Sequence, residues 1–112
     1  MALGIDTMFA EIILNLKQSN ADLFLECALP CIDQYSKWNK NEIKNYNLIL
    51  SLADKVTYVS NKQYFRGCMH KRNKYMVDSA TRVICVYSES KGTLFTLMYA
   101  QKKEKEILLL KQ

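Results

Sequence analysis

The sequence predicts an α/β protein in which about four parallel strands form a sheet between layers of helices. Two observations lead to this prediction. Segments with helical and with strand-like patterns alternate four times along the chain, and the strand-like segments are mostly apolar on both faces. Strands of that kind belong to parallel sheets that are covered by helices.

The first predicted element is a helix that begins near Gly4, with Asp6 placed to cap it, and that ends at residues 19–20. Its apolar side chains recur every three or four positions, which is the helical period. A mostly apolar strand is expected over residues 22–28, and Pro30 stops it. The helical repeat consists of Met8, Phe9, Ile12, Ile13 and Leu16.

The second helix is expected to begin after Asn39, because Glu42 three positions later completes a capping-box pattern. Residues 55–59 form the next predicted strand, since β-branched residues favour strands. A basic loop then leads to Gly67, and a third helix is predicted over residues 68–78.

The last two predicted strands flank the fourth helix. Residues 82–87 are typical of a buried strand, the helix begins at Gly92-Thr93, and the final strand covers residues 107–110. With right-handed crossovers, this order produces a three-layer, Rossmann-like sandwich. The length suits one domain and no repeat or linker interrupts it, so residues 1–112 are predicted to form a single domain.

The composition favours a soluble, cytoplasmic protein. It is 49% hydrophobic and 24% charged, and no apolar stretch approaches the ~20 residues that span a membrane. Asp6 and Glu11 interrupt the first apolar segment, so a secretory signal is not expected. Four cysteines in a chain with few turns are expected to be free thiols, which fits a reducing compartment.

The net charge of +5 is unevenly distributed. Residues 55–77 contain six basic side chains and no acidic one, whereas the rest of the chain holds ten basic and eleven acidic side chains. A local excess of positive charge suits an anionic ligand such as a nucleotide or a phosphate, and a solvated basic face is the alternative. Nucleic-acid binding by residues 55–77 is the least favoured reading, since no aromatic stripe is evident.

Ligands of open parallel sheets bind beyond the carboxyl ends of the strands, where loops meet helix N-termini. Three such junctions stand out: Gly4–Thr7, the basic loop before Cys68, and Ser88–Thr93. The last offers backbone N–H groups, small hydroxyls and a lysine to a phosphate, although a plain surface turn has the same composition. The glycine patterns of P-loops and of dinucleotide-binding turns are absent.

Cys27, Cys31, Cys68 and His70 raise the question of a metal site or a cysteine nucleophile. Their spacing lacks the tight C-x₂-C pairs of structural zinc sites. His70 is the sole histidine, and it lies two residues from Cys68 on a predicted helix, where side chains do not face each other. We therefore predict no metal, no cofactor and no catalytic residue.

The residues from Met69 to Met76, the strand at 82–87 and Gly92-Thr93-Leu94 resemble the M-x-x-R-K-x-x-M … G-G-x-G-T-x-x-E signature of LOG-type proteins. Those are Rossmann-like relatives of cytokinin riboside monophosphate phosphoribohydrolases. The chain more closely resembles the YpsA-like branch of the SLOG superfamily, a largely uncharacterised bacterial group. That resemblance covers nearly the whole chain, and its most specific part is the Arg-Asn-x-x-Met-Val-Asp block at 72–78.

The resemblance implies a ligand that is a nucleotide or derived from one. Arg72 would hold a phosphate, with a salt bridge to Asp78 or another carboxylate as the alternative role. Asp6 is first of all a candidate helix cap and second a contact to ribose or base, and Asn73 could bond a ribose, a base or the backbone. The candidate ligand-binding residues are Gly4, Asp6, Arg72, Asn73, Lys91, Gly92 and Thr93.

The chain departs from the family pattern in two respects. The catalytic glutamate of LOG-type hydrolases has no counterpart, because Phe95 and Thr96 follow Gly92-Thr93-Leu94, and an apolar residue cannot act as a general acid or base. The chain also lacks the strand, helix and strand with which the family begins. We expect the exposed sheet edges and apolar faces to be covered by self-association as a homo-oligomer, with a dimer favoured, while direct pairing of the remaining strands and a partner that supplies the missing elements are the alternatives. Met1 as the mark of a truncated reading frame or an internal start is a further alternative.

The leading hypothesis is therefore non-catalytic binding of a nucleotide or nucleotide-derived ligand, and an enzymatic activity is the less favoured alternative because Phe95 and Thr96 replace the LOG-type glutamate. The rival hypothesis is a protein-interaction or inhibitor module, encoded by a phage or mobile element, that has lost ligand binding. No membrane partner and no specific nucleic acid are expected.

Overall fold

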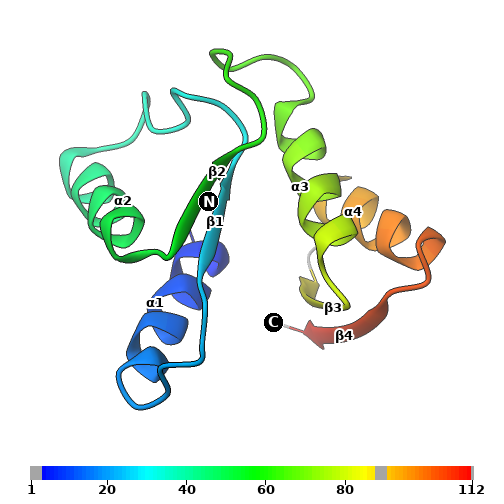
Figure 1. Cartoon of the computed structure of the whole chain (residues 1–112). Coiled ribbons are helices and arrows are strands. Elements are labelled where there is room, and N and C mark those ends of the chain that lie inside the picture. Colours follow the sequence, from blue (N-terminus) through cyan, green and yellow to red (C-terminus); the bar gives the residue numbers. More distant parts are fainter. Residues whose placement is uncertain (1–3, 88–90, 112) are drawn as a thin grey trace. The chain divides into compact units, whose positions relative to one another are not determined.

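The computed structural model describes residues 4–87 and 91–111. Helices and strands alternate in this part of the chain as predicted, which makes the protein an α/β protein (Figure 1). The elements are α1 (Ile5–Lys17), β1 (Glu26–Leu29), α2 (Lys40–Leu52), β2 (Lys55–Tyr58), α3 (Cys68–Ser79), β3 (Arg82–Tyr87), α4 (Lys91–Lys102) and β4 (Glu106–Lys111).

The strands form two parallel pairs. β1 pairs with β2, so that Glu26 lies opposite Lys55, and β3 pairs with β4, so that Arg82 lies opposite Glu106. Each pair is joined through a helix, α2 in the first and α4 in the second, which makes each a βαβ unit. The parallel pairing agrees with the prediction. Each sheet has two strands among the described residues, so the single sheet of about four strands is not confirmed.

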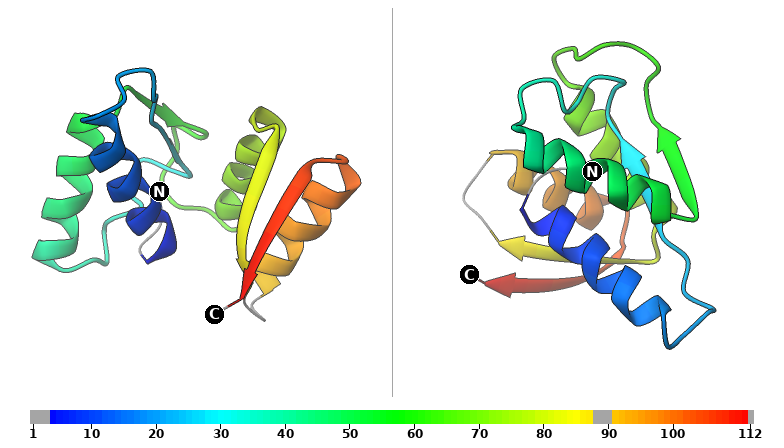
Figure 2. Two further views of the ribbon diagram at one scale, coloured as in Figure 1. Left: turned by 90° about the horizontal axis from the view of Figure 1, so that it is seen from below. Right: turned by 90° about the vertical axis from the view of Figure 1, so that its left-hand side faces the viewer.

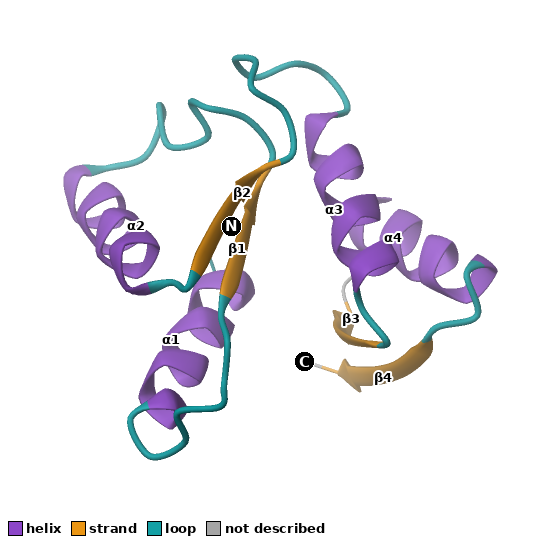
Figure 3. Ribbon diagram, viewed as in Figure 1, coloured by secondary structure: helices purple, strands orange, loops and turns teal. Residues whose placement is uncertain are grey.

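The chain divides into two compact units, Met1–Tyr64 and Phe65–Gln112, and each is described by itself. In the first unit, α1 and α2 lie on the same side of the β1–β2 pair, and in the second, α3 and α4 lie on the same side of the β3–β4 pair (Figures 2 and 3). The core of the first unit lies where the helices meet β1. It consists of Ala10, Leu25, Cys27, Leu29, Tyr46 and Ile49.

The start of α2 confirms the capping box predicted from the sequence. The backbone N–H of Glu42 donates to Asn39 Oδ1 at 2.8 Å, and the backbone N–H of Asn39 donates to Glu42 Oε1 at 2.9 Å. The two bonds satisfy donors that the first turn of a helix otherwise leaves without partners.

Two predictions at the start of the chain are corrected. The N-cap of α1 is Gly4, at φ 77°, without a side-chain cap bond, and Asp6 lies inside the first turn, where its charge complements the helix dipole. The first strand starts at Glu26 instead of residue 22. Asn20 is the reason, because its side chain and carbonyl accept the N–H groups of Asp22 and Leu23 and so form a turn.

Candidate functional site

The predicted ligand-binding residues are distributed over both units. Gly4 and Asp6 lie at the start of α1 in the first unit. The other five lie in the second unit, with two on α3 and three at the start of α4. They are Arg72, Asn73, Lys91, Gly92 and Thr93.

A chain of side-chain hydrogen bonds joins three of these residues in the second unit. Arg72 Nε donates to Asn73 Oδ1 at 2.8 Å, and Asn73 Nδ2 donates to Thr96 Oγ1 at 3.0 Å. The Thr96 hydroxyl in turn donates to the carbonyl oxygen of Gly92 at 3.1 Å. The chain therefore links α3 to the first turn of α4. Thr96 is a member of it that the sequence analysis did not include.

The guanidinium of Arg72 is nearly buried, because the residue is 3% exposed. Arginines are rarely buried unless their charged groups are bonded, and the bond from Nε to Asn73 is one such contact. Burial and hydrogen bonding together hold this side chain in one orientation. An exposed arginine side chain would instead sample several rotamers.

The first turn of α4 contains Gly92, which has no side chain. Gly92 adopts a helical conformation, and a Cβ atom placed on it would meet nothing within 4 Å. Thr93, the next residue, is half-buried. Ser88, Glu89 and Ser90 lie outside the described residues, as does the side chain of Lys91.

The two residues at the position of the LOG-type glutamate both have structural contacts. The Phe95 ring lies 4.2 Å from the ring of His70, measured between centroids. Thr96 takes part in the hydrogen-bond chain described above. Neither side chain carries a carboxylate that could transfer a proton at neutral pH.

Rings and ammonium groups alternate where α3 meets α4. Beside the stack of His70 on Phe95, Lys74 Nζ lies 5.5 Å from the ring centroids of both Phe95 and Tyr99. Lys103 Nζ lies 5.6 Å from the Tyr99 ring. These distances allow cation–π attraction. We call these five residues, His70, Lys74, Phe95, Tyr99 and Lys103, the α3–α4 seam.

The acidic side chain of Asp78 contacts the α3–α4 seam through Tyr99. The hydroxyl of Tyr99 donates to Asp78 Oδ1 at 2.8 Å, and this bond raises the pKa of Tyr99 above its ordinary value of 10.0. The seam was missed at the sequence level, because its members come from α3, from α4 and from Lys103 in the turn that follows α4. The spacing of four between His70 and Lys74 and between Phe95 and Tyr99 indicates a common face on each helix but not that the two faces meet.

The positive charge of the protein is concentrated in the second unit. Residues 65–112 carry ten basic and four acidic side chains, a formal charge of +6, whereas residues 1–64 carry six basic and seven acidic ones. The basic character noted for residues 55–77 is therefore part of a larger basic region that includes α4 and the residues after it.

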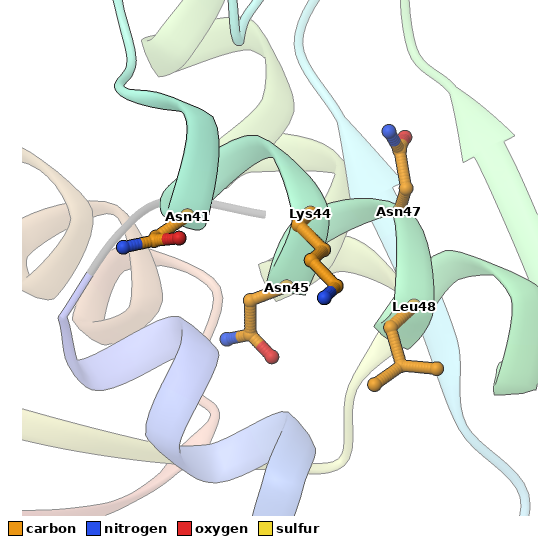
Figure 4. Close-up of a pocket in the computed structure, with 5 residues that line it drawn as sticks. All are labelled: Asn41, Lys44, Asn45, Asn47 and Leu48. Atoms are coloured by element: carbon orange, nitrogen blue, oxygen red, sulfur yellow. The ribbon is translucent and has the colours of Figure 1, made fainter.

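Two open hollows are present in the first unit. One, of about 480 Å³, lies along α2 and is lined by Asn41, Lys44, Asn45, Asn47 and Leu48 (Figure 4). The other, of about 530 Å³, lies between α1 and α2 and shares Asn45 and Leu48 with the first. No predicted site residue is among the described residues that line them.

The four cysteines are free thiols. Cys27, Cys31 and Cys68 are buried and Cys85 is partly buried, and burial raises the pKa of the Cys27 and Cys85 thiols. Within residues 4–87 and 91–111, no group of three His, Cys, Asp or Glu side chains could hold a metal ion. In the same part of the chain, no helix is long and apolar enough to cross a membrane.

A comparison with protein families decides where the chain belongs. The model of the YspA SLOG family matches residues 1–108. The chain belongs to the YspA SLOG family. The resemblance predicted from the motifs is thereby confirmed, and the match spans both units, including all seven predicted ligand-binding residues.

Curated relatives agree with membership of the YspA SLOG family. The chain is 27% identical over 107 residues to a UPF0398 protein of Halalkalibacterium halodurans, an alignment that covers 93% of this chain and 57% of the relative. It is 28% identical over 107 residues to UPF0398 proteins of Bacillus thuringiensis and Bacillus cereus, covering 94% of this chain and 58% of each relative. The chain thus spans somewhat more than half the length of these relatives.

Proposed function

We propose that this protein binds a nucleotide or a nucleotide-derived ligand without hydrolysing it, at the first turn of α4 in the second unit. The observation that carries the proposal is the hydrogen-bond chain from Arg72 through Asn73 and Thr96 to Gly92. It couples a buried cationic side chain to the N-terminal turn of a helix, where backbone N–H groups lack partners within the helix.

In this proposal the phosphate of the ligand lies at the first turn of α4. Helix N-termini bind phosphate through backbone N–H groups and the helix dipole. Gly92 allows close approach because it has no side chain, and Lys91 and Thr93 add an ammonium and a hydroxyl. Arg72 fixes Asn73 and supplies positive charge. The formal charge of +6 on the second unit attracts an anion to this region.

The absence of hydrolysis rests on the residues at the position of the LOG-type glutamate. Phe95 packs against His70, and the Thr96 hydroxyl bonds Gly92 and Asn73. Loss of a base from a ribose phosphate needs a group that supplies or accepts a proton, and neither residue offers one at neutral pH.

Gly92→Ala tests the proposed phosphate position directly. An added Cβ meets nothing within 4 Å, and alanine is the better helix former, so we expect stability to rise by roughly 0.5 kcal/mol. The same methyl group would obstruct a phosphate at this position. Calorimetric titration of the wild type with AMP, ADP, ATP and NAD identifies the nucleotide that binds, and the variant should bind that nucleotide at least ten-fold more weakly. Unchanged affinity in the stabilised variant would contradict the proposed position.

Arg72→Lys tests the role of the guanidinium. Lysine keeps the charge but loses Nε, so both the bond to Asn73 and the paired donors are lost. We expect nucleotide affinity to fall at least ten-fold, whereas the same change at the exposed Arg66 should alter it less than two-fold. Equal nucleotide affinities of the two variants would show that Arg72 is not part of the site. Thermal unfolding of both variants distinguishes a loss of binding from a loss of folding.

A second candidate function, a protein-interaction module, is supported by α1. Its exposed apolar side chains follow one helical stripe, although surface helices usually turn such residues inward. This stripe is proposed to be buried in a homodimer. Native mass spectrometry should then find a dimer that Ile12→Gln converts to a monomer. The stripe consists of Ile5 (40% exposed), Met8 (54%), Phe9 (49%), Ile12 (47%) and Leu16 (50%).

A further inference from the structure

The α3–α4 seam combines two chemical features on one surface. Its rings, Phe95 and Tyr99, are four residues apart on α4, which places them about 6 Å apart along the helix axis. The ammonium groups lie over the ring faces, Lys74 Nζ at 5.5 Å from both centroids and Lys103 Nζ at 5.6 Å from that of Tyr99. Aromatic faces that alternate with cations are the combination with which proteins hold unpaired bases next to their phosphates.

The α3–α4 seam is accessible and lies in the basic unit. His70, Lys74 and Lys103 are exposed, and Phe95 keeps 36% of its surface open. Asp78, an acidic side chain next to the seam, accepts the Tyr99 hydroxyl. Since the second unit has a formal charge of +6, a polyanion is drawn to this surface.

We infer that the α3–α4 seam binds single-stranded nucleic acid without sequence preference. Bases take the place of the ammonium groups over the Phe95 and Tyr99 rings and stack there, and the flexible Lys74 and Lys103 side chains turn to the neighbouring phosphates. Stacking tolerates any sequence, because every base has a π-face. A duplex hides its base faces in the stack, so single strands are preferred. This surface adjoins the proposed nucleotide site, because Phe95 directly precedes Thr96 of the hydrogen-bond chain, but the inference does not rest on nucleotide binding there.

The charge part of the inference is tested by comparing two double variants. Lys74→Gln with Lys103→Gln removes two positive charges from the α3–α4 seam. Lys37→Gln with Lys44→Gln removes two charges from exposed positions of the first unit and is the matched control. Fluorescence anisotropy with labelled 12-mers of oligo-dT and oligo-U, between 50 and 200 mM salt, gives the affinity and its salt dependence.

The seam variant should bind at least ten-fold more weakly at low salt. Its slope of log K against log salt should be shallower by about 1.4, because each lost phosphate contact contributes about 0.7 for a single strand. The control should stay within two-fold of the wild type. Equal losses in both double variants would mean diffuse charge attraction and would overturn the assignment, as would absence of binding by the wild type at 50 mM salt.

The stacking part is tested with Phe95→Leu, which keeps an apolar side chain but removes the ring. We expect a loss of five-fold or more with an unchanged salt slope, because stacking does not release counterions. Circular dichroism checks that the variant folds, and His70→Ala, an exposed change in the same stack, provides a second test. Wild-type affinity in both variants, or a duplex that binds as tightly as the single strand, would overturn the inference.

Discussion

The carboxylate of Asp54 ties three segments of the first unit together. One oxygen pairs with Lys17 at the end of α1, and the other accepts the backbone N–H of Leu25, just before β1, at 2.8 Å. Asp54 itself lies between α2 and β2. Two hydrogen bonds hold the pKa of Asp54 below its ordinary value of 3.8. The bond from Lys17 has the larger effect and the bond from Leu25 the smaller one.

This pKa shift makes part of the stability dependent on pH. Because the folded pKa is lowered, the unfolded state binds more protons near pH 4, so the contribution is present above the unfolded pKa of 3.8 and is lost as the pH falls through the folded value. Asp54→Asn should therefore lower the Tm at pH 7. This difference should shrink below pH 4, whereas Asp22→Asn, at an exposed position, should change the Tm little at either pH. A difference that stays constant down to pH 3 would contradict the linkage.

The contacts of single residues were the least predictable part of the molecule. Asp54 is separated from Lys17 by 37 positions and from Leu25 by 29, and Asn73 from Thr96 by 23. No periodicity or motif connects such distant positions, because the contacts exist only after the elements have packed. In the sequence, Asp54 is recognisable only as a short acidic residue between a predicted helix and a predicted strand. Many residues of that kind make no long-range contact, so this position alone does not predict the bonds to Lys17 and Leu25.

At the scale of elements, local chemistry was sufficient for α2. Its capping box involves residues three positions apart, and both bonds form as predicted. Asn39→Ala should lower the free energy of unfolding by about 1 kcal/mol, measured by urea titration, because a backbone donor loses its acceptor. Glu42→Gln is the control, since glutamine completes the same motif, and it should cost clearly less. Equal losses would mean that the charge of Glu42, rather than the cap geometry, stabilises the helix.

The start of the first strand shows where local patterns are insufficient. Residues 22–28 have strand-like apolar character, but the Asn20 turn uses the first backbone donors, and pairing with β2 starts at Glu26. Apolar character indicates that a segment can form a strand, whereas the length of a strand depends on the partner to which it hydrogen-bonds.

At the scale of the whole molecule, the chain consists of two compact units with a boundary between Tyr64 and Phe65. The residues around this boundary are open to solvent, with Tyr64 65% exposed and Arg66 also exposed. Limited digestion with trypsin should therefore cut first after Arg66, because proteases cleave exposed loops before helices and strands. A first cut within α2 or α4 would contradict this boundary, and Arg66→Gln should slow the first cleavage several-fold.

The sequence alone determined the class of the protein, the order of its elements, the capping of α2 and the family. These properties depend on residues that are close together in the chain or on motifs at set spacings, so they can be found without coordinates. Only the tertiary structure decided which strands pair, that Arg72 is buried and connected through Asn73 to Thr96, and that the rings of α4 meet His70 and Lys74 of α3. The physical reason is that such contacts join elements distant in sequence, and burial and geometry select them from many combinations that the sequence permits.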